Sequence, residues 1–137
     1  VEPGKKPLSS MSPTVVLNED GSPFMVLGTP GGARIFASVA QVISRVIDHN
    51  IPLHDAISIP KIWNNGGANN LQYENALKGY EDYAVTDETL AKLVEMGHGD
   101  ITTAASGSVQ AIEFLEDGTL YGTADPRQDG KAVGVNK

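Results

Sequence analysis

Two pairs of adjacent small residues are the strongest candidates for chemistry in this sequence. Ser9 and Ser10 stand just before a β-branched run, in PLSSMSPTVV, and Gly31 and Gly32 stand just before a long amphipathic stretch, in VLGTPGGARI. Serine hydroxyls rotate to suit an acceptor, so the first pair could donate two hydrogen bonds to a carboxylate. Glycines that open a helix leave backbone N–H groups free to face an oxyanion. Taken alone, each pair is more simply a self-capping loop or a glycine-permitted turn.

The other polar side chains point less clearly to chemistry. His49 and His54 are five residues apart, which is not the i, i+4 spacing that puts two metal ligands on one helix face, and His98 lies between two glycines. We therefore expect neither a metal site nor a cofactor. Asp125 and Arg127 could form a buried ion pair or pin the end of the chain, and we expect a structural role rather than a catalytic one.

Regular elements must position the two candidate pairs. Strands at 14–17 and 24–27, joined by the turn-forming residues 19–23, predict a hairpin of two buried strands. Apolar residues that recur every four positions predict a helix over 33–48, with an apolar face broad enough to pack on a sheet.

Strands and helices also follow one another in the rest of the chain. We predict a short helix at 53–58, a turn-rich loop at 64–70, a short strand at 71–74, a helix that begins after Thr86 and ends at Gly97, and a second hairpin at 108–115 and 119–123. Antiparallel strand pairs with helices between them predict an α+β layered fold, not a doubly wound parallel sheet. We expect residues 1–137 to form one domain.

Composition excludes several functions. The 10 basic and 17 acidic residues give a formal charge of −7, and the basic residues form no cluster that could follow phosphates, so nucleic acid is not an expected partner. The apolar runs are too short to span a membrane, and the first residues do not read as a signal peptide. The absence of cysteine excludes disulfides and thiolate nucleophiles but fits cytoplasm and periplasm equally.

Six blocks of sequence, taken together, resemble the small subunit of γ-glutamyltranspeptidases in order and approximate spacing. They are PLSSMSPT, GTPGGARI, VID, GSVQAI, GTLYG and ADPR, and they cover nearly the whole chain. The chain thus resembles the C-terminal part of that subunit. The resemblance implies an N-terminal-nucleophile hydrolase with an αββα sandwich, which cuts itself into a large and a small subunit. It implies that the exposed N-terminal threonine attacks γ-glutamyl amides of glutathione-like compounds, in the periplasm or outside the cell.

The same resemblance assigns roles to both candidate pairs. In the family, the adjacent serines hold the α-carboxylate of the γ-glutamyl group, which maps onto Ser9 and Ser10, and the two glycines supply the oxyanion hole, which maps onto Gly31 and Gly32. The nucleophilic threonine lies well upstream of the serine block in the family, and Val1 has no hydroxyl to activate. We expect this chain to hold half a site, completed by the rest of the small subunit and the large subunit.

Departures from the family leave alternatives open. The stretch PKIWN at 60–64 stands where the family has Pro-Arg and a following His, and the segment between Tyr73 and Thr86 is longer than is typical. A related β-lactam side-chain acylase or a poly-γ-glutamate depolymerase would keep the fold and change the substrate. A non-catalytic fragment or binding module is the third alternative. A piece of a sandwich would also expose sheet edges and apolar surface, which favours self-association.

Overall fold

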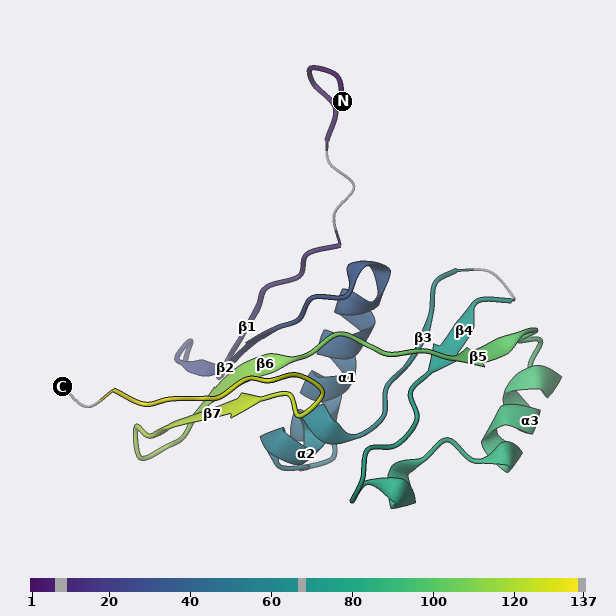
Figure 1. The fold of residues 1–137 in the computed structure, drawn as a ribbon. Coiled ribbons are helices and arrows are strands. Elements are labelled where there is room, and N and C mark those ends of the chain that lie inside the picture. Colours follow the sequence, from purple (N-terminus) through teal and green to yellow (C-terminus); the bar gives the residue numbers. More distant parts are fainter. Residues whose placement is uncertain (7–9, 67–68, 136–137) are drawn as a thin grey trace.

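The fold consists of two small sheets and three helices, seen in a computed structural model that describes residues 1–6, 10–66 and 69–135 (Figure 1). The strands are β1 (Thr14–Leu17), β2 (Pro23–Gly28), β3 (Ile62–Asn64), β4 (Leu71–Tyr73), β5 (Ile101–Thr103), β6 (Gln110–Phe114) and β7 (Leu120–Ala124). The helices are α1 (Ile35–Ile47), α2 (Leu53–Ser58) and α3 (Asp87–Glu95), with the 3-10 turns η1 (Gly32–Arg34) and η2 (Glu81–Tyr83). Within the described residues, no helix has the length and apolar character that a bilayer crossing requires.

The larger sheet brings four loops to one of its ends. Its order is β1-β2-β6-β7, and every neighbouring pair is antiparallel. Thr14 pairs with Leu27, Gly28 with Gln110, and Gln110 with Ala124. The segments before β1, after β2, before β6 and after β7 therefore leave the sheet at the same end. Both predicted hairpins are confirmed.

Helices α1 and α2 cover one face of this sheet (Figure 1). Met25 on β2, Val42 on α1 and Ile57 on α2 have no exposed surface, and they belong to one continuous hydrophobic cluster. Fully burying a side chain of this size stabilises the fold by about 1.5–3 kcal/mol. The predicted helix over 33–48 is confirmed, although its first turn is the 3-10 turn η1.

The opposite face of the sheet is open. Val15 and Leu17 on β1 are 61% and 56% exposed, so the prediction of two buried strands is wrong for β1. The reason is that helices lie against one face only, while the alternation of a strand places every second side chain on the other face.

The smaller sheet is mixed. Its order is β3-β4-β5, with β3 and β4 antiparallel and β4 and β5 parallel, so the expected antiparallel pairing does not hold throughout. The predicted strand at 71–74 is confirmed as β4. The predicted loop at 64–70 is confirmed at 65–66 and 69–70, whereas Asn64 is the last residue of β3 and residues 67–68 lie outside the described residues. The strands β3 and β5 were not predicted. Each has only three residues, too few to display an alternating pattern.

Helix α3 forms where its capping signals predict it. The Thr86 hydroxyl accepts a hydrogen bond from the backbone N–H of Thr89 at 3.2 Å, and the chain turns at Gly97, whose φ is 95°. No residue of α3 is buried, so its apolar stripe lies at the surface of the described chain.

Candidate active site

The Gly31–Gly32 turn has a conformation that only glycine adopts easily. Gly31 has φ 148° and Gly32 has φ 57°, both in the region that a Cβ disfavours. The carbonyl of Gly31 accepts from the N–H of Arg34 at 3.2 Å, and that of Gly32 accepts from the N–H of Ile35. Among the described residues, the N–H groups of Gly31 and Gly32 donate no hydrogen bond. The turn therefore presents two backbone donors at the start of α1, where the helix dipole favours negative charge.

The serine pair is only partly described. Ser9 lies outside the described residues. Ser10 is half-buried, and its carbonyl accepts a hydrogen bond from the Ser12 hydroxyl at 3.0 Å. Because the segment before β1 and the segment after β2 leave the same end of the sheet, Ser10 and Gly31 lie on neighbouring loops. The register does not by itself bring the Ser10 hydroxyl to the glycine N–H groups.

A third loop at this end of the sheet touches the glycine turn, and sequence reasoning missed it. A Cβ on Gly107 would collide with the Pro30 carbonyl oxygen and the Thr29 hydroxyl, and a Cβ on Gly31 would lie 3.5 Å from the Gly107 backbone nitrogen. Residue 107 must be glycine for the two backbones to approach so closely. The glycine in GSVQAI is the only signal in the sequence that could have pointed to this contact.

The predicted ion pair between Asp125 and Arg127 is confirmed and belongs to a larger buried cluster. Asp125 Oδ1 lies 3.0 Å from Arg127 Nη1, with the two side chains 0% and 11% exposed. Glu74 also pairs with Arg127, at 2.9 Å to both Nε and Nη2, and accepts backbone N–H groups from Lys61 at 3.0 Å and Ser106 at 2.8 Å. These contacts tie the end of the chain to the loop that carries Gly107.

Three cations surround the C-terminal end of α2, where backbone carbonyls lack helical partners. The Ile57 carbonyl accepts from Lys61 Nζ at 2.7 Å and from Arg127 Nη1 at 2.9 Å, and Arg45 Nη1 donates to the Ala56 carbonyl at 3.0 Å. The cluster thus caps a helix as well as pairing charges.

Burial sets the ionisation of this cluster. Burial, with repulsion from Arg127, lowers the pKa of Lys61 to about 8, and burial lowers the pKa of Arg45 to about 10. Burial alone would raise the pKa of Glu74, but hydrogen bonds from Ser106 and the nearby cations outweigh it, so that the pKa lies below its ordinary value. Every charged group has hydrogen-bond partners here, which indicates a structural cluster.

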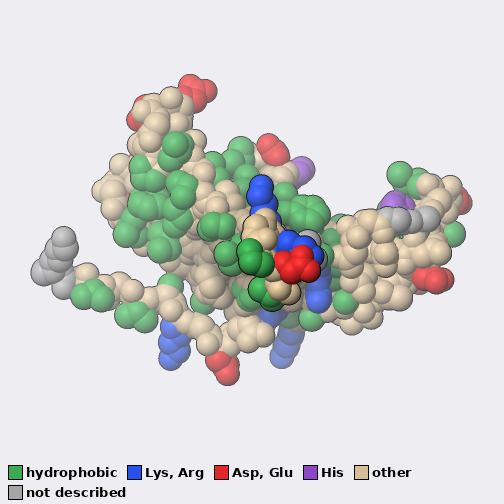
Figure 2. Space-filling view, turned by 90° about the horizontal axis from the view of Figure 1, so that it is seen from above, with side chains coloured by type: hydrophobic (Ala, Val, Ile, Leu, Met, Phe, Trp, Pro, Cys, Tyr) green, Lys and Arg blue, Asp and Glu red, His purple; other side chains and the backbone are tan. Residues whose placement is uncertain are grey.

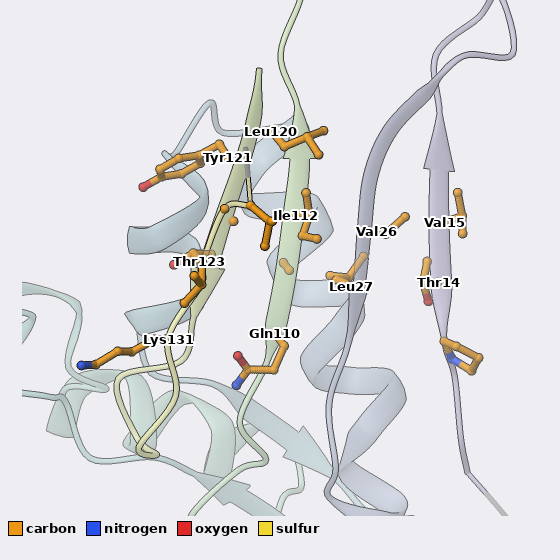
Figure 3. A pocket seen from close by; sticks show the side chains of 17 residues that line it. Thr14, Val15, Val26, Leu27, Gln110, Ile112, Leu120, Tyr121, Thr123 and Lys131 are labelled. Carbon is orange, nitrogen blue, oxygen red and sulfur yellow. The ribbon is translucent and has the colours of Figure 1, made fainter. Parts of the chain in front are cut away.

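An apolar hollow lies away from the glycine turn. It measures about 990 Å³ and lies between the open face of the four-stranded sheet and the segment 131–135 (Figure 3). Its lining is mainly apolar and includes Val15, Val26, Ile112 and Leu120. Within the described residues, no group of three or more His, Cys, Asp or Glu side chains could hold a metal ion.

Known structures share this arrangement of sheets and helices. The γ-glutamyltranspeptidase from Pseudomonas nitroreducens complexed with L-DON superposes with a TM-score of 0.80 at 34% identity, over 99% of this chain and 67% of that chain. The mixed α+β fold therefore matches part of a γ-glutamyltranspeptidase. A sequence model of the family described as "Gamma-glutamyltranspeptidase" matches residues 1–135, and the chain belongs to this family.

Two similar proteins are much longer than this chain. The "Glutathione hydrolase proenzyme" of Bacillus subtilis (strain 168) is 38% identical over 99% of this chain and 22% of its own length. The "Acylase ACY 1 proenzyme" of Pseudomonas sp. (strain SE83) is 35% identical over 99% of this chain and 23% of its own length. The chain thus spans less than a quarter of either relative.

Proposed function

We propose that this chain is the C-terminal part of the small subunit of a γ-glutamyltranspeptidase, which hydrolyses or transfers the γ-glutamyl group of glutathione-like compounds. The observation that carries the proposal is the Gly31–Gly32 turn at the start of α1. Among the described residues, its two backbone N–H groups donate no hydrogen bond and are available to a ligand. The names of the glutathione hydrolase relatives support the substrate class. Their greater length supports the view that other segments complete the enzyme.

Each candidate pair has one task in this proposal. A threonine hydroxyl from an upstream segment attacks the γ-carbonyl carbon and gives its proton to the threonine's own amine, while the carbonyl oxygen becomes an oxyanion that accepts hydrogen bonds from the Gly31 and Gly32 N–H groups. The oxyanion then re-forms the carbonyl as the C–N bond breaks, and the leaving amine takes the proton from the threonine amine. Water or an acceptor amine finally attacks the γ-glutamyl ester and releases the threonine hydroxyl. Ser9 and Ser10 donate their hydroxyls to the α-carboxylate and fix the substrate's position. Loss of a single oxyanion donor lowers kcat by about 10²–10³-fold in other hydrolases.

The open face of the four-stranded sheet is the second feature that the proposal explains. Hydrophobic side chains gather over the four-stranded sheet (Figure 2), and Val15 is 61% and Ile112 39% exposed. In this proposal the remainder of the protein covers the face and completes an αββα sandwich. The isolated chain should self-associate through it, and sedimentation that is independent of concentration would contradict this. Val15→Glu should weaken the association.

Kinetics of the full-length protein test the proposal. Release of nitroaniline from a γ-glutamyl anilide is expected. Ser10→Ala should raise KM, because it weakens ground-state binding, and Gly31→Ala should lower kcat, because alanine disfavours a φ of 148°. Gly118→Ala is the matched control, since Gly118 also has a positive φ, of 81°, but lies in the β6–β7 turn at the other end of the sheet. A full-length protein without γ-glutamyl hydrolysis refutes the proposal. The purified 137-residue chain alone should show no turnover.

A second candidate function is acylase activity, favoured by the relative named "Acylase ACY 1 proenzyme". Rates on glutathione, a glutaryl amide and poly-γ-glutamate separate a γ-glutamyltranspeptidase from an acylase and from a depolymerase. An upstream reading frame without a threonine at a processing site would instead favour a non-catalytic module. The periplasmic or secreted location belongs to the same proposal, and cell fractionation tests it.

A further inference from the structure

We propose that Arg34 is a positioning residue that holds the Gly31–Gly32 turn in the orientation its N–H groups need, a proposal that rests on the oxyanion role given to these glycines. Arg34 follows the turn directly, as the last residue of η1. Its backbone N–H closes the turn by donating to the Gly31 carbonyl at 3.2 Å.

The side chain of Arg34 joins the turn to two other parts of the fold. Its guanidinium carbon lies 5.5 Å from the centre of the Trp63 ring on β3, within the range of a cation–π contact. Its Nη1 donates to the Ala105 carbonyl, in the loop that leads to Gly107. One residue therefore links the glycine turn to both the smaller sheet and the contacting loop.

The Trp63 ring gives Arg34 a fixed platform. The side chain is 4% exposed, and its Nε1 donates to Gln72 Oε1 at 3.1 Å on the paired strand β4.

The loop that carries Ala105 is equally well anchored. The N–H of Ala104 donates to the Tyr73 carbonyl at 2.9 Å, and the N–H of Ser106 donates to Glu74 at 2.8 Å, in the buried ion cluster. Arg34 thus connects the two-glycine turn to segments that are themselves held by the core.

The turn needs this restraint because glycine has many accessible conformations. On one side, the backbone of Gly107 limits movement, since it lies against Pro30 and Gly31. On the other side, Arg34 supplies the side-chain link. A donor displaced by about 1 Å from an oxyanion can cost on the order of 10²-fold in rate. In this proposal Arg34 acts through the backbone of the turn, because its guanidinium contacts Trp63 and the Ala105 carbonyl.

The test uses the full-length protein and separates kcat from KM. Arg34→Met should lower kcat by about 10- to 100-fold per correctly processed molecule, with KM within about twofold of wild type. Arg34→Lys, which keeps the cation over Trp63, should restore part of kcat. Lys78→Met is the control, because Lys78 is exposed and lies outside these contacts. The melting temperature and the processed fraction are measured for each variant.

A second variant keeps the proposal testable if Arg34→Met does not fold. Trp63→Leu removes the aromatic ring and should lower kcat in the same direction. Combined with Arg34→Lys, it should lower kcat below that of Arg34→Lys alone, because the lysine cation then has no ring to contact. Normal kcat with a lower melting temperature would make Arg34 a purely structural residue. A raised KM with unchanged kcat would make it a substrate contact. Either result overturns the proposal while leaving the proposed function intact. A wild-type protein without γ-glutamyl hydrolysis refutes the proposed function first and this inference with it.

Discussion

Replacing Lys61 by methionine should remove most of the pH dependence of stability between pH 8 and pH 9.5. The Lys61 side chain is fully buried, its Nζ donates to the Ile57 carbonyl at 2.7 Å, and Glu74 Oε2 lies 3.8 Å away. Methionine keeps the length of the side chain and its contacts with apolar neighbours, and it removes the titrating group. The variant therefore isolates one ionisation inside the cluster.

The magnitude follows from the pKa of Lys61, which burial and Arg127 lower from 10.5 to about 8. Between these two values the unfolded chain keeps a proton that the folded chain has released, so the free energy of unfolding rises with pH. The full slope is about 1.4 kcal/mol per pH unit, which gives a rise of about 1.5 kcal/mol over this window because Lys61 is half-titrated at its start. The pH range from 8 to 9.5 ends below the pKa of Arg45, which is about 10, and below the pKa of Tyr80, which is raised above its ordinary value of 10. Lys61 is therefore the main contributor to the rise in this range.

Urea unfolding of the 137-residue chain at several pH values measures this rise. Trp63 is the single tryptophan, buried and two residues from Lys61, so its fluorescence reports on this region, and far-UV circular dichroism reports on the whole chain. Lys78→Met is the matched control, since it removes an exposed lysine, and it should keep the wild-type profile. A Lys61→Met profile as steep as that of wild type would show that Lys61 is not the titrating group.

Three further substitutions test other parts of the fold. Glu74→Gln should lower the free energy of unfolding at pH 7 by about 3 kcal/mol, because it leaves Arg127 and Lys61 short of a buried carboxylate. The pKa of Glu74 is lowered in the folded state, so its contribution is lost as pH falls through that value, and this variant should unfold less steeply in acid titrations. Gly107→Ala should cost about 3 kcal/mol in urea unfolding, because its methyl group meets the Pro30 carbonyl oxygen, and an unchanged midpoint would disprove the close approach. Thr86→Ala should weaken α3 by about 1 kcal/mol, seen as faster amide exchange in this helix, while the global urea midpoint hardly moves because α3 buries no residue.

Local signals predicted most of the regular elements correctly. The two hairpins depend on turn residues between β-branched runs, α1 on a four-residue repeat of apolar positions, and α3 on the Thr86 cap, and all of these act within a few residues of chain. The strands β3 and β5 escaped prediction because pairing with distant residues stabilises them. Ile101 on β5, for example, pairs with Leu71, thirty positions earlier.

The family resemblance, the α+β class and the glycine turn before a long helix could all be predicted from the sequence, because each depends on residues that are contiguous in the chain. The surroundings of that turn depend instead on contacts between distant parts of the chain. Glu74 meets Arg127 across 53 positions, and Arg34 reaches Ala105 across 71. Such contacts arise when four loops leave one end of a sheet, and the order of its strands is set by packing and pairing of the whole chain, not by any local pattern.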